Sequence, residues 1–118
     1  MLGKLVAVAA VATAALALAP AAFAHNVSVS PRYGELGSDF VFFGTAWQRY
    51  HRVRWFYDEH ADGSFQQSST FRVNRYGRFR FRWSGEDVVD THRFCFRQFD
   101  TRYQRTFFKC RLYTVFVT

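Results

Sequence analysis

The chain lacks isoleucine and has only two cysteines, two prolines and one methionine among its 118 residues. Beyond residue 24, leucine occurs only as Leu36 and Leu112, so the aliphatic residues that usually fill a core are scarce. The apolar side chains that remain are mainly Phe, Val, Tyr and Trp, which favour strands over helices. We therefore expect an all-β fold with an aromatic core.

Sequence motifs that carry catalysis are missing as well. The chain has no G-x-S-x-G nucleophile motif and no glycine loop of the kind that cradles phosphates. At 118 residues it is one domain at most, and shorter than most cofactor-binding α/β enzymes. A hydrophobic content of 49% is too high for a disordered tail. We expect a protein that is not an enzyme and that uses no cofactor.

Residues 1–24 have the pattern of a secretory signal peptide. A positive charge is followed by the apolar and small-residue run 5–19, and Ala22-Phe23-Ala24 offers a small-x-small cleavage site. The run is about 15 residues long, shorter than the roughly 20 residues that span a bilayer. The sequence predicts cleavage before His25, a single domain over residues 25–118 with no membrane span, and a secreted or extracytoplasmic location.

Cys95 and Cys110 are the only cysteines, so in an oxidising compartment they have one intramolecular partner each. They lack the C-x-x-C spacing of redox and metal sites, and we expect a structural disulfide. If the two residues face each other across a strand pair, core residues meet basic ones on the same sheet face. We therefore expect a β-bulge in the last strand, or a disulfide between positions that are not directly opposed. The mismatched pairs are Phe94 with Arg111 and Phe96 with Lys109.

Alternation of apolar and polar residues predicts seven short strands, because successive side chains of a strand point to opposite faces. The clearest case has Phe79, Phe81 and Trp83 on the inner face and arginines between them. A single sheet this apolar would leave one face wet, so two stacked antiparallel sheets are expected. The expected strands cover residues 26–30, 39–44, 52–58, 65–73, 78–83, 92–99 and 106–117.

The residues Val29-Ser-Pro-Arg-Tyr-Gly-Glu-Leu-Gly37, then Phe40-Val-Phe-Phe-Gly44 and Trp47, resemble the opening of bacterial secreted immunoglobulin-like domains. The segment Val73-Asn-Arg-Tyr-Gly-Arg-Phe79 is similar to the turn before the fifth strand of those domains. The resemblance implies an immunoglobulin-like β-sandwich whose usual role is adhesion, ligand binding or spacing. We expect a non-catalytic binding or structural module at the bacterial cell envelope or in the medium, with an unknown ligand.

Arginine is the dominant charge, with 14 Arg and one Lys against nine acidic residues in residues 25–118. A row of three arginines on one strand would place them roughly 7 Å apart, and two more could extend the row if their strand shares the sheet. Such a patch could bind an anionic envelope polymer or carbohydrate, whereas export makes nucleic acid an unlikely partner. The alternative is a normal solvated sheet face. The candidate residues are Arg78, Arg80 and Arg82, extended by Arg52 and Arg54.

Aromatic side chains offer a second route to carbohydrate binding, because their faces stack on sugar rings. Trp47 and Tyr50 fall in a predicted loop and are the members expected to be exposed. The alternative is that most of these residues pack in an aromatic core. The other candidates are Trp55, Tyr57 and Tyr76.

His25 offers a metal-binding alternative. If cleavage makes it the first residue, its α-amine and imidazole can chelate copper together, with a second imidazole from His51, His60 or His92. Small periplasmic copper carriers and copper-dependent polysaccharide oxygenases use this arrangement on immunoglobulin-like sandwiches, and residues 24–31 resemble the start of such a carrier. The alternative is an incidental terminal histidine.

Acidic residues gather near the predicted turns, at Asp58, Glu59 and Asp62 and again at Glu86, Asp87 and Asp90. Neither group has a recognisable spacing for calcium ligands or for paired catalytic carboxylates. Aspartate is favoured in turns because its side chain accepts hydrogen bonds from the nearby backbone. We expect turn chemistry at both places.

Overall fold

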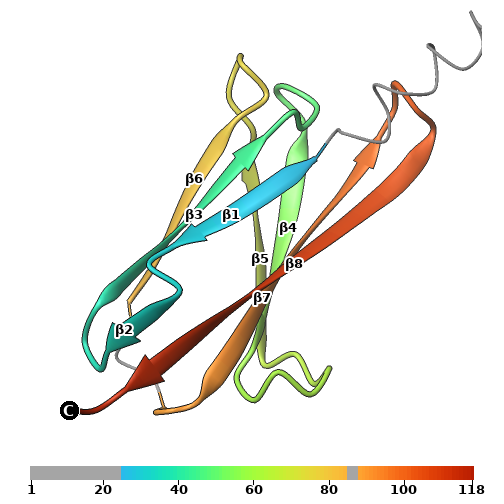
Figure 1. Ribbon diagram of the computed structural model, residues 1–118. Coiled ribbons are helices and arrows are strands. Elements are labelled where there is room, and N and C mark those ends of the chain that lie inside the picture. The colour runs from blue at the N-terminus through green and yellow to red at the C-terminus, as the bar shows by residue number, and fades with distance from the viewer. Residues whose placement is uncertain (1–24, 85–87) are drawn as a thin grey trace, which may run out of the picture.

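The computed structural model describes residues 25–84 and 88–118, and their regular structure consists of strands in two facing sheets (Figure 1). The predicted signal peptide, residues 1–24, lies outside the described residues. No helix within the described residues could cross a membrane. The strands are β1 (Asn26–Ser30), β2 (Tyr33–Glu35), β3 (Asp39–Thr45), β4 (Arg52–Asp58), β5 (Gln67–Arg72), β6 (Phe79–Ser84), β7 (Thr91–Asp100) and β8 (Arg105–Phe116).

One sheet has three strands in the order β1-β3-β6, and the other has five in the order β2-β8-β7-β4-β5. The seven predicted strands are confirmed, with ends that differ by at most two residues. The additional strand is β2, which lies in a segment expected to be a connection. It pairs in parallel with β8, so the expectation of purely antiparallel sheets is wrong at this edge. Three residues are too short to show a period, and only main-chain pairing reveals the strand.

The core between the sheets is aromatic, as the composition predicts. Phe42 from the small sheet lies 4.9 Å, ring centre to ring centre, from Phe94 of the large sheet. Phe40 packs on Tyr113 at 4.5 Å, and all four side chains are buried. Tilted and edge-on ring pairs of this kind add to the free energy gained by burying apolar area. The alternation in β6 is confirmed too, since Phe79 is buried and the arginines are exposed.

Asp58 confirms the expected turn chemistry at the end of β4. Its buried carboxylate accepts hydrogen bonds from the backbone N–H of Gly63 at 2.8 Å and of Asp62 at 3.2 Å. The Arg93 guanidinium also donates to it at 2.7 Å. Burial raises the pKa of the Asp58 carboxyl, but these hydrogen bonds outweigh burial, and the pKa lies below its usual range. The carboxylate is therefore ionised and fully engaged at neutral pH.

The last strand was expected to contain a β-bulge, or the disulfide to join positions that are not directly opposed, and both expectations are wrong. Pairing of β7 with β8 runs without interruption, and Cys95 lies directly opposite Cys110 with a Cα–Cα distance of 4.0 Å. The inner face of the large sheet can carry both core and basic residues here, because the three-stranded sheet does not cover all of the five-stranded one. Arg111 lines a hollow of about 730 Å³ beside β1, together with Val27, Val29 and other residues. Its side chain is exposed there, so its charge stays solvated.

Removing the disulfide is expected to destabilise the domain by about 3 kcal/mol, because the bond closes a loop of about 15 residues in the unfolded chain. The test is chemical denaturation of the Cys95→Ala/Cys110→Ala variant beside the wild type, with circular dichroism as the readout. The β spectrum should persist while the midpoint falls. An unchanged midpoint would contradict a stabilising role for this bond.

Candidate functional site

A cleft of about 660 Å³ lies at one end of the sandwich, where three connections meet. Residues 46–51 between β3 and β4 form one wall, and residues 75–77 between β5 and β6 form another. Arg102, in the turn between β7 and β8, completes the lining. Figure 1 shows these connections at the same end of the molecule, away from the C-terminus. Segments far apart in the sequence therefore build one site.

The lining of the cleft is basic and aromatic. It contains the three arginines Arg49, Arg75 and Arg102 and the exposed tyrosines Tyr50 and Tyr76, without a single carboxylate. The Arg75 guanidinium carbon lies 4.8 Å from the centre of the Tyr76 ring, a cation–π distance. Among the described residues, neither Arg49 nor Arg75 forms an ion pair, so their charge faces solvent.

Backbone hydrogen bonds join the two walls. The N–H of Trp47 donates to the Gly77 carbonyl at 3.0 Å, and the N–H of Tyr50 donates to the Val73 carbonyl at 3.0 Å. Tyr50 holds the left-handed backbone conformation with φ of 65°. That conformation costs free energy for a bulky side chain and persists only where the surroundings enforce it. The backbone of Tyr50 is thus held in place, and with it the point from which the exposed ring projects.

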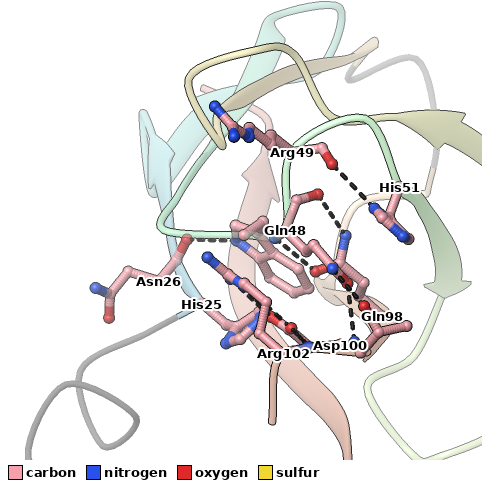
Figure 2. Close-up of polar contacts among 10 residues, drawn as sticks. His25, Asn26, Gln48, Arg49, His51, Gln98, Asp100 and Arg102 are labelled. Atoms are coloured by element: carbon pink, nitrogen blue, oxygen red, sulfur yellow. Dashed lines mark hydrogen bonds and ion pairs between the residues drawn. The ribbon is translucent and has the colours of Figure 1, made fainter. Parts of the chain in front are cut away.

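Two buried glutamines, Gln48 and Gln98, hold the cleft wall in place through hydrogen bonds (Figure 2). The backbone N–H of Gln48 donates to Gln98 Oε1 at 2.8 Å, and Gln98 Nε2 donates to the Gln48 carbonyl at 3.1 Å. The Gln48 side chain in turn bonds Thr101, through Oε1 at 2.9 Å and Nε2 at 2.6 Å. Both glutamines are buried, so these bonds satisfy amides that water cannot reach. They tie the β3–β4 connection to the β7–β8 hairpin.

Next to the glutamines, Asp100 links His25 to Arg102 (Figure 2). Its buried carboxylate lies 2.7 Å from His25 Nε2, and the Arg102 Nη2 donates to the same oxygen at 2.7 Å. The Arg102 backbone N–H adds a bond of 2.9 Å to Oδ1. The His25 ring stacks on Phe107 with a centre distance of 3.7 Å. Asp100 therefore holds Arg102, one of the three cleft arginines, in a fixed orientation.

The charge states of this pair follow from burial and hydrogen bonding. Burial lowers the pKa of His25, and the hydrogen bond that His25 donates to Asp100 only partly opposes that effect. Burial raises the pKa of Asp100, but the bonds from Arg102 and His25 outweigh it, and the pKa ends below its usual value. At neutral pH a neutral imidazole thus donates from Nε2 to an ionised carboxylate.

His25 is buried, and its ring contacts those of Trp47 and Phe107. No group of three His, Cys, Asp or Glu side chains within residues 25–84 and 88–118 lies close enough to hold a metal ion. His51 lies in the lining of the cleft, His60 bonds Asp90 at the surface, and His92 is buried beside Tyr57. Copper binding by His25 with a second imidazole stays a prediction.

The five predicted arginines do not form one patch. Arg80 and Arg82 lie on β6 of the small sheet, whereas Arg52 and Arg54 lie on β4 of the large sheet. The two sheets face each other, so their outer arginines point to opposite sides of the molecule. Arg78, Arg80 and Arg82 line a separate hollow of about 370 Å³ at the edge of the sandwich. The extension of the row by Arg52 and Arg54 required that β4 and β6 share a sheet, and that condition is not met.

The aromatic candidates divide in a similar way. Trp47 is buried, and its indole N–H donates to the Asn26 carbonyl at 3.0 Å, so the expectation that it is exposed is wrong. Tyr57 is buried and Trp55 is partly buried, as core packing predicts. Tyr50 is exposed as expected, and Tyr76 joins it in the cleft.

The three arginines of the cleft were not predicted from the sequence. Each of them is followed directly by a tyrosine, in the pairs Arg49-Tyr50, Arg75-Tyr76 and Arg102-Tyr103. Each pair falls in a connection between strands, where the alternation of the sheets is broken. The Arg-Tyr dipeptide is only a partial signal, because it also occurs as Arg32-Tyr33, outside the cleft, and it does not show that the three pairs meet.

Comparison of the chain with models of protein families, with curated proteins and with solved structures finds no match in any of the three.

Proposed function

We propose that the protein is an exported, non-catalytic binding module with an immunoglobulin-like sandwich, and that its cleft binds an anionic polysaccharide of the envelope or the medium. The observation that carries this proposal is the lining of the cleft, in which three arginines and two exposed tyrosines occur without a carboxylate. The disulfide between Cys95 and Cys110 supports export, since such bonds persist in oxidising compartments.

The two residue types serve different parts of an acidic sugar. A guanidinium donates two parallel N–H bonds to a carboxylate or sulfate, and Arg49 and Arg75 have their donors available. The tyrosine rings supply apolar faces that stack on a sugar ring with little loss of side-chain entropy. Arg102 is oriented by its bond to Asp100, whose charge offsets its own, so it contributes a fixed donor position more than net positive charge. The cleft thus selects a ring that carries a negative group.

Calorimetric titration with polygalacturonate tests the proposal, with neutral dextran as the comparison polymer. The wild type should bind polygalacturonate and ignore dextran. Replacing Arg75 by Gln should weaken binding by about ten- to a hundredfold, because a hydrogen bond to a charged group contributes about 1.5–3 kcal/mol.

Arg32→Gln is the matched control, because Arg32 is exposed but lies outside the cleft. It changes the net charge by the same amount and should leave the affinity almost unchanged. Equal losses in the two variants would show that overall charge, rather than the cleft, holds the polymer, and the proposed site would be abandoned.

A further inference from the structure

A second surface lies on the outer face of the five-stranded sheet and consists of phenylalanines. Phe56 on β4 and Phe108 on β8 have ring centres 5.9 Å apart. Phe65, in the connection between β4 and β5, folds over the same face and lies 5.3 Å from Phe56 and 6.4 Å from Phe108. We call these three residues the outer phenylalanine cluster. It lies above the disulfide, since Phe56 is opposite Cys95 in the sheet.

Much of this cluster is open to solvent. Phe65 is 41% exposed and Phe108 is 48% exposed. By strand register, Phe99 on β7 and Leu112 on β8 point to the same face, and they are 53% and 54% exposed. Single exposed apolar residues need no explanation, but a group on one sheet face marks an interaction surface. The inner core gains nothing from these side chains.

Basic residues accompany the cluster. Arg54 and Arg97 lie opposite each other in the β4–β7 pairing, and the Arg97 guanidinium carbon is 5.0 Å from the centre of the Phe56 ring. Asp58 shares this face of β4, but its carboxylate is buried and bound to Arg93. On the strands beside the cluster the exposed charges, Arg54 and Arg97, are positive, and the acidic residues Glu59 and Asp62 lie in the connection that carries Phe65.

These features limit the kinds of partner that could bind the outer phenylalanine cluster. A second copy of this chain would bring two arginine-bearing faces together, and like charges at close range repel. A folded protein partner anchors its central side chains in pockets. None of the three hollows described above has Phe56, Phe65 or Phe108 in its lining. A lipid surface needs no pocket, because its headgroup region adapts to the side chains that enter it.

We propose that this face binds the surface of an anionic bilayer. The exposed phenylalanines enter the boundary between headgroups and acyl chains, and Arg54 and Arg97 donate to lipid phosphates. The arginine stems can lie along the apolar zone while their charged ends reach the phosphates. The residues involved do not line the cleft, so this proposal does not depend on the ligand proposed there.

Sedimentation with vesicles tests this inference on the secreted wild-type protein. Vesicles of phosphatidylglycerol mixed with phosphatidylcholine should carry the protein down, and vesicles of phosphatidylcholine alone should not. Phe108→Ser should weaken binding by about tenfold, the loss expected when one large apolar side chain no longer leaves water. Raising the salt concentration should weaken it further, because the phosphate contacts are screened.

Phe43→Ser is the matched control. Phe43 is 39% exposed on β3 of the other sheet and has the Arg80 guanidinium carbon 5.8 Å from its ring centre, so it copies the aromatic–arginine pairing on a different face. This variant should bind vesicles as the wild type does. Equal losses in the Phe43 and Phe108 variants, or no binding of the wild type to anionic vesicles, would overturn the proposal. Binding of a glutamate–tyrosine copolymer that Phe108→Ser abolishes, without vesicle binding, would assign the face to an acidic polypeptide instead.

Discussion

Replacing Asp100 by Ala is expected to destabilise the domain by about 3–5 kcal/mol, because removing one member of a buried polar cluster leaves the other members without hydrogen-bond partners. Both nitrogens of the enclosed His25 ring would then lack a partner, because Nδ1 already has none. Arg102 would lose its only carboxylate among the described residues. Urea denaturation followed by tryptophan fluorescence measures this loss.

Two further variants sharpen the Asp100 prediction. Asp100→Asn keeps one side-chain oxygen as an acceptor and should lose less stability than Asp100→Ala. Asp39→Ala removes an exposed carboxylate whose ion pair with Arg82 lies at the surface, and little change is expected there. If Asp100→Ala lost as little stability as Asp39→Ala, the buried Asp100–His25 pair would not be a main source of stability at the cleft end of the sandwich.

Replacing Gly77 by Ala is expected to cost about 2–4 kcal/mol, from a left-handed backbone and a steric clash together. Gly77 has φ of 73°, and an added Cβ would lie 2.6 Å from the carbonyl oxygen of Trp47. That oxygen belongs to the backbone, and the Trp47 N–H is bonded to Gly77, so neither wall can move freely. Thermal unfolding measures the loss, and binding to the cleft should fall with it.

Gly37→Ala separates the two causes. Gly37 also has a positive φ, of 93°, but an added Cβ would meet no atom within 4 Å. This variant should lose about 1 kcal/mol from the backbone alone. Equal losses at the two glycines would mean that the contact with Trp47 contributes nothing.

The sheets were predictable because burial acts on every second residue. In β6 the pattern gives both the strand and its inner face, and the same holds for β4, where Val53 and Tyr57 are buried. The mismatch of Phe94 with Arg111 led to a wrong expectation of a bulge. Pair register says which residues are opposed, but not how far the opposite sheet extends over them. Coverage is a property of the assembled layers, and no local pattern reports it.

The site was less predictable because its parts come from separate connections. Nothing local in the sequence shows that Arg75 and Arg102 line one cleft, since their proximity depends on how the hairpins stack. His25 illustrates the same limit. Its place after the predicted cleavage site suggested a metal ligand, and nothing in that local pattern shows that Asp100 and Phe107, which lie far along the chain, surround its ring.

Nuclear magnetic resonance titration with trigalacturonate tests the role of the cleft most directly. The account predicts that backbone amide signals of residues 49–51 and 75–77 shift together and saturate, while those of Arg80 and Arg82 on β6 remain in place. Shifts that follow β6 and spare the cleft, or no shifts at all, would contradict it.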